Sequence, residues 1–256
     1  MEPTKPTDAK AVPAAGEHGP LLERAREVLP SATLERMMKG NHDAIAEIMK
    51  YETSMVTPEQ LDAVMPALLK AEEDCYPEDM RDGEEHLRWI ATKGPLMTLN
   101  MKDEIAGYVS SCSGSALPET LEEDDDPEEG FFGKPEETQE YCKDDVLYVW
   151  NVSITPKHQQ KHLFTTLLYP ATIQKAVEGG YKKMVFHSRV SENLVPLYEQ
   201  KYGAKVIRRV ENWFPDLPEE LFDLVEIDLD PKTNPKMAEV LTRKLPFRTD
   251  GGEVQA

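Results

Sequence analysis

Hydrophobic positions along the chain change their spacing several times, and these changes predict the order of its elements. Within residues 20–50, apolar residues recur every three or four positions in three short blocks, which is typical of small amphipathic helices. A strand is predicted at 51–56, and the helical spacing returns at 57–74 and at 83–92. Across 95–109 alternate positions become apolar, which predicts a β-hairpin.

The second half of the chain predicts strands and helices in alternation. The run Val146–Ile154 is apolar at almost every position, as expected of a central strand that is buried on both faces. After it we predict a helix, a strand, a helix and two strands at 161–178, 183–188, 193–202, 204–210 and 221–229. This order indicates a mixed α/β (α+β) domain.

The remaining segments predict how the chain is divided. Residues 1–19, with three prolines among alanine and charged residues, are interpreted as a disordered leader. Residues 20–50 form a helical extension, and 51–230 form the main domain, which carries an acidic insertion at 113–145. Residues 231–256 are interpreted as a tail with one short helix.

Composition and charge exclude several classes of protein. The 256 residues include 48 acids and 29 bases, a net charge of −19, which argues against a protein that coats nucleic acid or binds anionic membranes. No apolar run approaches the roughly 20 residues of a membrane-spanning helix, and the N-terminus lacks a secretory signal. Cys75, Cys112 and Cys142 lie far apart without metal-ligand spacing, which predicts no metal site and a reducing, cytoplasmic location.

The charge is distributed unevenly. Residues 119–145 hold 13 acids and two lysines, and we expect this segment to be mobile and dispensable for folding unless Phe131 and Phe132 belong to the core. The next 32 residues, 146–177, contain no acid at all. Such a stretch is where this acidic protein would tolerate an anion.

The loop between the central strand and the following helix is a candidate anion site. Backbone N–H groups of residues 160–165 are expected to be unpaired and to point along the helix axis. Residues 155–161 contain bases and no acids. Every strand–loop–helix unit has such a terminus, so this geometry alone does not define a site.

The residues of this loop resemble a known motif. The stretch from Val152 to Pro156, followed by Gln159, His162, Phe164 and a pair of leucines, resembles the acyl-CoA-binding motif of GNAT-type N-acetyltransferases. In that family a strand ending in V-x-P or I-x-P precedes the pattern R/Q-x-x-G-x-G/A, whose loop binds the pyrophosphate.

Other stretches resemble the same family more loosely. Residues 193–204 resemble its N-x-x-A-x-x-L-Y-x-K-x-G-F signature, with Asn193 and Tyr198 at the matching positions but with shifted spacing. Residues 105–109 resemble its second hairpin strand, and 71–80 resemble the end of its first helix with the acceptor-side loop.

The resemblance covers residues 50–230 and implies a fold and an activity. The implied fold is a GNAT-like, mainly antiparallel twisted sheet that splays between Val146–Ile154 and 183–188, where the pantetheine arm binds like an added strand. The implied activity is N-acyltransfer from acetyl-CoA to an amine by direct attack. The residues implied to bind acetyl-CoA are Val152, Ile154, Gln159, Gln160, Lys161, His162, Leu163, Phe164, Thr165 and Asn193.

Tyr198 and Asn193 have two interpretations each. Tyr198 resembles the family tyrosine that protonates the departing thiolate, and a phenol with a pKa of about 10 suits that role. It would equally serve as a helix tyrosine packed on the sheet. Asn193 resembles the family residue that contacts the cofactor arm, although capping of the helix with Pro196 in its first turn would be reason enough for it.

The loop departs from the family pattern at both glycines, which are replaced by His162 and Phe164. If the loop still binds a pyrophosphate, both side chains must turn outward while Lys161 or His162 supplies donors. CoA binding should then be weak and should improve when the glycines are restored. The other interpretation is a GNAT fold that has lost its cofactor. Pro170 additionally interrupts the helix after the loop.

The general base and the acceptor have no motif. His187, Asp144 and Asp145 are candidate bases, and Tyr148 and Trp150 alternate on one strand face as core residues or as a substrate cage. The acidic segment suits a cationic acceptor such as a small-molecule amine or a basic peptide. Two non-catalytic alternatives remain open, a protein-interaction module and an acyl-CoA sensor. The oligomeric state is not predicted.

Overall fold

The computed structural model describes residues 19–40, 42–121, 130–211, 213, 219–248 and 254–255. Its helices are α1 (Gly19–Val28), α2 (Ser31–Gly40), α3 (His42–Ile48), α4 (Leu61–Cys75), α5 (Glu84–Lys93), α6 (Pro135–Tyr141), α7 (Tyr169–Glu178), α8 (Val195–Tyr202) and α9 (Pro235–Leu241). Its strands are β1 (Glu52–Met55), β2 (Met97–Met101), β3 (Glu104–Ser113), β4 (Val146–Ile154), β5 (Lys183–Arg189), β6 (Lys205–Val210), β7 (Phe222–Asp228), β8 (Phe247–Arg248) and β9 (Val254–Gln255). The predicted leader, apart from its last residue, lies outside the described residues.

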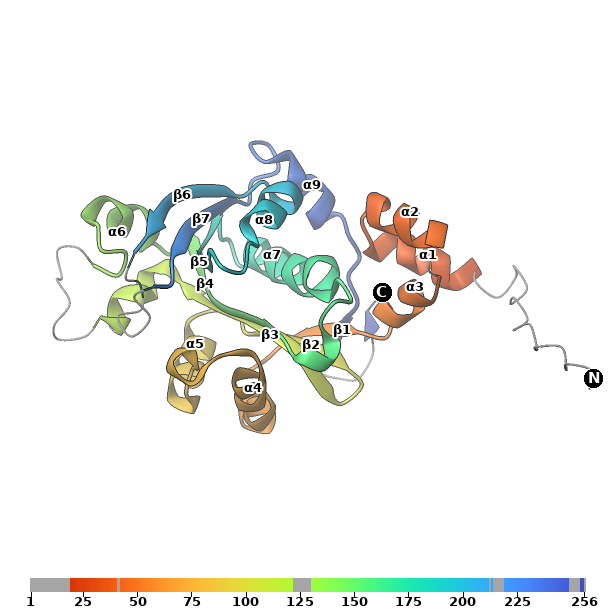
Figure 1. Ribbon diagram of the computed structural model, residues 1–256, viewed down its shortest axis with the longest axis horizontal. Helices are drawn as coiled ribbons and strands as arrows, with labels where there is room; N and C mark the ends of the chain where they lie inside the picture. Colours follow the sequence, from red (N-terminus) through yellow and green to blue (C-terminus); the bar gives the residue numbers. More distant parts are fainter. Residues whose placement is uncertain are drawn as a thin grey trace, which may run out of the picture.

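The strands form one sheet in the order β6-β7-β5-β4-β3-β2-β1-β8-β9. Neighbours are antiparallel except for β4 with β5 and β1 with β8, which are parallel. Helices α4 and α5 cover one face of this sheet, while α7, α8 and α9 cover the other (Figure 1). The arrangement confirms the predicted mixed, mainly antiparallel α/β fold.

The two central parallel strands separate after three residues. Val146, Leu147 and Tyr148 of β4 pair with β5, and the pairing stops there. Beyond Tyr148, β4 continues to Ile154 paired only with β3 on its other side. The predicted splay between these strands is therefore confirmed, and the second half of β4 has an open edge.

A β-bulge lies where β4 leaves β5. Ser110 and Ser111 of β3 face Asn151 and Val149, so Trp150 is an extra residue without a partner. A bulge turns the side chains that follow it relative to the strict alternation of a strand. Both Trp150 and Asn151 accordingly contact groups from the α4–α5 region.

The N-terminal extension shares its core with the sheet. Ala25 and Val28 of α1 and Ile45 and Ile48 of α3 are buried in the same apolar cluster as Leu99 of β2. Full burial of an aliphatic side chain contributes roughly 1.5–3 kcal/mol, so several of them attach these helices firmly. Figure 1 shows the three helices beside the β1 end of the sheet.

Part of the predicted tail also belongs to the core. Met237 and Val240 of α9 are at most 1% exposed, and the side chain of Gln174 in α7 donates a hydrogen bond to the Val240 carbonyl (2.9 Å). Phe247 then pairs with Thr53 of β1. The apolar side chains of a single short helix hold this segment against α7 and α8, which corrects its interpretation as a tail.

The acidic insertion packs more tightly than its composition suggests. Phe132 is 1% exposed, and its carbonyl accepts a hydrogen bond from the Arg208 guanidinium (2.8 Å). The same guanidinium donates to the carboxylate of Glu137 in α6 (2.7 Å). The expectation that the whole insertion is dispensable is therefore corrected for its second half, because its aromatic and charged groups lock onto β6. Residues 122–129 lie outside the described residues.

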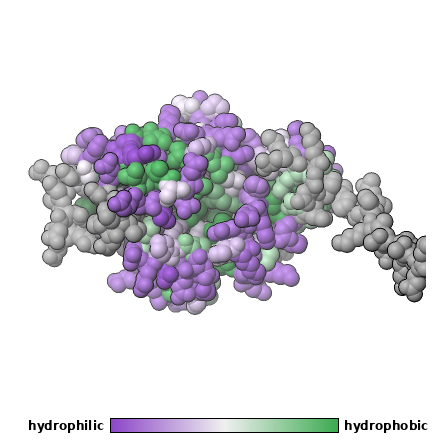
Figure 2. Space-filling view, in the orientation of Figure 1, coloured by the Kyte–Doolittle hydropathy of each residue, from purple (hydrophilic) through white to green (hydrophobic). Residues whose placement is uncertain are grey.

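Strand β6 forms one edge of the sheet. A register shift between Val206 and Arg208 leaves Ile207 as a bulge residue. The side chains of Val206 and Ile207 are 41% and 39% exposed, and Figure 2 shows a hydrophobic patch in this region. Lys205 and Arg209 are exposed on the same strand.

Candidate functional site

The loop after β4 has a backbone that is unusual for its sequence. Gln160 and His162 have φ angles of 62° and 58°, in the left-handed region that favours glycine. His162 stands where the motif has its first glycine, so the glycine-like conformation is kept without the glycine. A left-handed residue other than glycine costs about 1–2 kcal/mol, which indicates that the surrounding structure imposes this shape.

The same loop presents unpaired backbone donors. The first helical hydrogen bond runs from the Thr166 N–H to the His162 carbonyl (3.0 Å). Among the described residues, the N–H groups of 160–165 have no hydrogen-bond partner. Unpaired N–H groups at a helix N-terminus attract anions, so the loop retains the donor set of an anion site.

The helix after the loop begins with a wide turn. Phe164–Leu168 forms a π-helical turn, in which the Tyr169 N–H donates to the Phe164 carbonyl, before α7 continues. Pro170 lies in the first turn of α7. Proline lacks an N–H and clashes with the carbonyl four residues earlier in an α-helix, and the wider turn relieves that conflict. The predicted single helix at 161–178 is thus divided.

The two side chains that replace the glycines point in different directions. His162 is exposed, as required if the loop binds an anion. Phe164 turns inward, with its ring centroid 5.0 Å from that of Tyr169 and 5.7 Å from that of Tyr198. The bulk of Phe164 therefore joins the aromatic core below the loop.

Other loop side chains are tied to the N-terminal extension and the hairpin. Lys161 Nζ lies 3.1 Å from both Glu47 Oε1 and the Tyr51 hydroxyl. His158 is buried, with Nδ1 2.8 Å from the same hydroxyl and Nε2 3.2 Å from Glu104. Lys161 is therefore engaged in an ion pair rather than being a free donor at the loop.

The open edge of β4 carries two carbonyl groups that already have partners. The Val152 carbonyl accepts a hydrogen bond from the Tyr76 hydroxyl (2.7 Å), and the Ile154 carbonyl accepts one from the Gln159 side chain (3.0 Å). Both partners are side chains that can rotate, whereas the backbone of β4 is fixed by β3. The backbone groups expected to bind an added strand thus face the gap.

Tyr198 lies on α8, above the separated part of β5. Its side chain is 4% exposed, and its ring centroid lies 4.8 Å from that of Phe186. Burial raises the pKa of its phenol well above the usual value, so the group is protonated at neutral pH. Among the described residues its hydroxyl has no hydrogen-bond partner. Both interpretations of Tyr198 are compatible with this position.

Asn193 does not cap the helix. Helix α8 begins at Val195, and the residue in the cap position is Leu194, without a side-chain hydrogen bond. Asn193 instead has a φ of 50°, a left-handed conformation that asparagine tolerates better than most residues. The expected role as a cap is therefore wrong, while Pro196 lies in the first turn as predicted.

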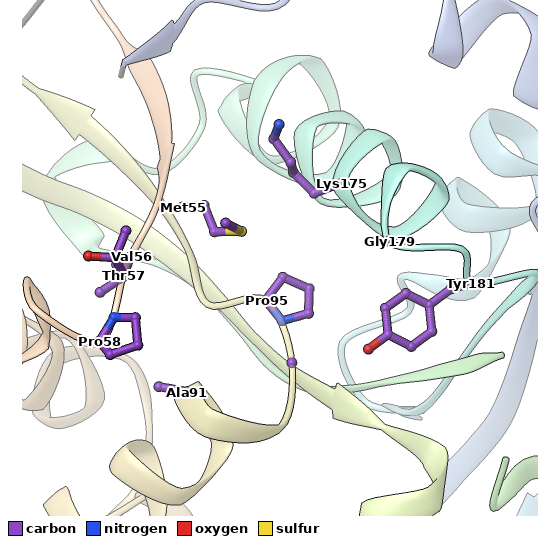
Figure 3. Close-up of a pocket in the computed structure, with 10 residues that line it drawn as sticks. Met55, Val56, Thr57, Pro58, Ala91, Pro95, Lys175, Gly179 and Tyr181 are labelled. Atoms are coloured by element: carbon purple, nitrogen blue, oxygen red, sulfur yellow. The ribbon is translucent and has the colours of Figure 1, made fainter. Parts of the chain in front are cut away.

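A pocket elsewhere in the molecule is separate from this loop. It has a volume of about 350 Å³ and lies at the C-terminal end of α7, where Pro95, Lys175 and Tyr181 line it (Figure 3). Lys175 Nζ is paired with Glu178 (2.6 Å) and lies 4.5 Å above the ring of Phe247. The loop at 160–165 precedes the opposite end of the same helix.

Comparisons identify the fold but not a family by sequence. No family model and no curated protein matches the sequence. Ard1 from Thermoplasma volcanium superposes with a TM-score of 0.50 at 9% identity, over 71% of this chain and 99% of that one. The ribosomal-protein-S18-alanine N-acetyltransferase from Escherichia coli gives 0.49 at 12% identity, over 70% and 94%. YncA from Salmonella typhimurium, solved with acetyl-CoA, gives 0.46 at 14%, over 71% and 95%.

The fold is that of the GNAT-type N-acetyltransferases. The described part of this GNAT fold contains no helix long and apolar enough to cross a membrane. Within the same described ranges, no group of three or more His, Cys, Asp or Glu side chains is arranged to hold a metal ion.

The candidate bases do not lie together in this GNAT fold. His187 lies on the separated part of β5 and is partly buried. Its Nδ1 forms a hydrogen bond with the Tyr148 hydroxyl (2.8 Å), and its ring stacks on Trp213. Burial lowers its pKa to about 3, so it stays neutral. Asp145 forms an ion pair with Lys182 (2.8 Å) at the paired end of β4, and its neighbour Asp144 is exposed there.

The structure instead reveals two carboxyl groups beside the bulge of β4, a buried one and a largely buried one. Glu72, on α4, is 1% exposed and accepts hydrogen bonds from the Tyr108 hydroxyl and the Asp82 N–H (2.7 Å). The Asn151 side chain donates to Asp82 Oδ2 (2.8 Å) and approaches Glu72 Oε1 (3.4 Å). The bulge therefore places an amide between two acids.

Both carboxyl groups have raised pKa values. Burial, and next the charge of Glu72, raise the pKa of Asp82 from 3.8 to about 7, while hydrogen bonds from Trp150 and Asn151 oppose the shift. Burial also raises the pKa of Glu72. A carboxyl group that titrates near neutral pH is suited to proton transfer.

The sequence contains one signal for this pair. Leu61, Met65 and Leu68 form the buried stripe of α4, and Glu72 continues it at the same helical spacing. An acid on an apolar stripe is rarely buried without partners, so the position of Glu72 indicates that polar groups pack against this part of α4.

Proposed function

We propose that the protein transfers an acetyl or other short acyl group from acyl-CoA to an amine by direct attack. One observation carries this proposal: the unpaired N–H groups of residues 160–165 adjoin the open edge of β4 in a GNAT fold. A donor set at a helix N-terminus suits a pyrophosphate, and an open strand edge suits the amide groups of a pantetheine arm.

The residues present fit acyl-CoA. The N–H groups of 160–165 would bind the pyrophosphate, with the exposed side chain of His162 turned away. The carbonyl groups of Val152 and Ile154 would bind the pantetheine arm once Tyr76 and Gln159 rotate. Lys161 would act by holding the loop rather than by contacting a phosphate.

Asp82 is the proposed general base. It lies beside the bulge, 12% exposed, and its raised pKa allows it to take up a proton near neutral pH. The charged or titratable groups that face it are Glu72 and His86, whose Nε2 lies 3.7 Å from Asp82 Oδ1. The Asn151 side chain donates to the Asp82 carboxylate, and Glu72 accepts from the Asp82 backbone N–H, so both residues position Asp82.

Acyl-CoA supplies a thioester carbonyl when bound. The neutral amine would attack that carbonyl carbon and displace the thiolate, and Asp82 would take up the proton that the nitrogen loses. Tyr198, whose buried phenol is protonated, then donates a proton to the departing thiolate. Each proton that leaves the amine is matched by one that reaches the sulfur.

The partners follow from charge and the cysteines. A net charge of −19 favours a cationic amine acceptor, and it disfavours nucleic acids and anionic membranes. Cys75, Cys112 and Cys142 are free thiols, which supports a reducing cytoplasm as the location. Both statements are part of the proposal.

Calorimetry with free CoA, followed by thiol release from acetyl-CoA over an amine panel, tests the proposal. We expect CoA to bind and at least one amine to release thiol, with activity rising through about pH 7 and lost in Asp82→Asn. No CoA binding would favour a non-catalytic interaction module. Binding without thiol release for any amine would favour an acyl-CoA sensor.

A further inference from the structure

Four large aromatic side chains meet on the sheet face that carries α5. Trp89 of α5, Phe131, Trp150 of β4 and Trp213 form a contiguous group, which we call the aromatic wall. Ring centroids are 6.3 Å apart for Trp89 and Trp150, 5.7 Å for Phe131 and Trp150, and 5.2 Å for Phe131 and Trp213. The members come from segments far apart in the sequence.

The wall is partly open to solvent. All four side chains are intermediate in exposure, neither buried nor fully exposed. The chain has three tryptophans, and all three belong to this wall. A contiguous surface of large aromatic side chains on a monomer is uncommon and marks a place where an apolar group binds.

The proposed base adjoins one side of the wall. Trp150 donates a hydrogen bond to Asp82, and its neighbour Asn151 donates another. The ring of His86 lies beside that of Trp150, with centroids 4.5 Å apart and planes tilted by 47°, and its buried Nε2 has no hydrogen-bond partner among the described residues. An acidic group and an unpartnered polar atom thus lie at the edge of an aromatic surface.

We infer that the aromatic wall binds the carbon skeleton of the acceptor, and that this acceptor is a primary arylalkylamine. An aromatic ring gains about 0.5–1.5 kcal/mol from each favourable ring contact, beyond the area that it buries. A second carboxylate adjoins the wall, because Glu119 accepts a hydrogen bond from Trp89 Nε1 (3.2 Å), but it is already paired with Lys93 Nζ (2.8 Å). Asp82 is therefore the acid that matches a single ammonium group. A polyamine or a lysine-rich peptide carries further charges, which one unpaired carboxylate does not match.

This inference rests on the proposed function for the reaction itself, but not for binding. Loss of an amine proton to Asp82 and formation of the amide bond occur at the end of the amine, and the ring lies away from the reacting atoms. The wall can therefore be tested by binding alone. Because the three tryptophans all belong to the wall, intrinsic fluorescence reports on this surface specifically.

The binding test titrates the full chain, saturated with free CoA, with phenethylamine and with n-propylamine, which lacks the ring. We expect a saturable change of tryptophan emission with phenethylamine and none with n-propylamine. Trp150→Ala should raise the dissociation constant of phenethylamine about tenfold, and Trp150→Phe, which keeps a ring, should largely retain it. Met55→Ala, at an exposed site on β1, is the matched control.

The turnover test uses acetyl-CoA with phenethylamine, n-propylamine and spermidine. We expect kcat/KM to be at least about tenfold higher for phenethylamine than for the other two, and Trp150→Ala to remove that preference. Emission that does not respond to phenethylamine, or equal binding by Trp150→Ala, would overturn the inference. Saturable binding without thiol release would overturn the proposed reaction and leave the wall as an amine-binding surface.

Discussion

Lys161 Nζ of the loop after β4 forms an ion pair with Glu47 Oε1 of α3, 114 residues earlier in the chain, at 3.1 Å. Their side chains are about one-third exposed, at 32% and 33%. The hydrogen bond with the Tyr51 hydroxyl, and next the one with Glu47, raise the pKa of Lys161. The N-terminal extension thus holds the very loop whose N–H groups are unpaired.

This pair predicts the effect of two substitutions on CoA affinity. Lys161→Ala and Glu47→Gln should each weaken CoA binding severalfold, because each releases the loop, and the double variant should be no worse than either single one. Calorimetry on the four proteins measures the coupling. If Lys161 instead contacts a phosphate directly, Glu47→Gln would free it and strengthen binding, which is the opposite result.

The two residues in place of the motif glycines should respond differently to glycine. His162→Gly should raise the free energy of unfolding by about 0.5–1 kcal/mol, because glycine adopts the observed φ of 58° without strain. Phe164→Gly should lower it by about 2 kcal/mol, because the ring packs on Tyr169 and Tyr198.

Urea unfolding and CoA calorimetry check both variants. We expect CoA to bind more tightly to His162→Gly and more weakly to Phe164→Gly, since only the first removes bulk without removing packing. If CoA affinity and the free energy of unfolding changed in the same direction in both variants, the outward His162 and the inward Phe164 would not have different roles.

Tyr198→Phe should separate catalysis from stability. The Tyr198 hydroxyl has no hydrogen-bond partner among the described residues. Its removal should therefore leave the free energy of unfolding unchanged or raise it slightly. Thiol release should fall about 100-fold if this hydroxyl protonates the thiolate. CoA affinity is the internal control and should not change. Undiminished thiol release would assign Tyr198 to packing on the sheet.

Asp82 predicts a pH dependence of stability. Its pKa is raised from 3.8 to about 7, so between these values the folded protein binds this proton more tightly than the unfolded chain does. The free energy of unfolding therefore falls as pH rises across that window, by up to about 4 kcal/mol for an isolated group. Because asparagine does not titrate, this fall in the free energy of unfolding should be absent in Asp82→Asn.

The variant should thus be more stable than the unmodified protein at about pH 8 and no more stable at about pH 4, by the same linkage. Urea unfolding at both pH values measures the difference. If the variant and the unmodified protein differed in stability by the same amount at both pH values, the raised pKa of Asp82 would be contradicted. Asp145→Asn, at an exposed ion pair, is a control for the loss of one negative charge.

Phe132→Ala should test the role of the acidic insertion. We expect a loss of about 3–5 kcal/mol, because the ring is 1% exposed and packs against Tyr141 and Tyr148. Thermal unfolding measures it, with Phe131→Ala as a milder comparison on the partly exposed neighbour. A shift of only a few degrees for Phe132→Ala would restore the view of the insertion as a dispensable loop.

The sequence predicted the elements whose signals are local. The strand Val146–Ile154 was found at the predicted residues, because a continuous apolar run and Pro156 define its ends. The splay after Tyr148 and the unpaired N–H groups of 160–165 also followed from the strand–loop–helix order and the resemblance.

The features that were missed depend on contacts between distant residues. Strict alternation along β4 does not place Asn151 beside Glu72, because the bulge at Trp150 changes the faces that follow. The packing of Phe132 depends on Arg208, 76 residues later, and no local pattern announces it. Long-range ion pairs and bulges therefore account for most of the difference between the predicted and the observed structure.

The two edges of the sheet bear on how the protein behaves at high concentration. An edge strand exposes a row of N–H and C=O groups that can recruit strands from other molecules and start aggregation. One edge is the short strand β9, which pairs with β8, while the other edge, β6, exposes Val206 and Ile207. The bulge at Ile207 and the charges of Lys205 and Arg209 oppose the flat, regular pairing that fibrils require. An apolar edge is thus combined with geometry and charge that keep it from extending the sheet.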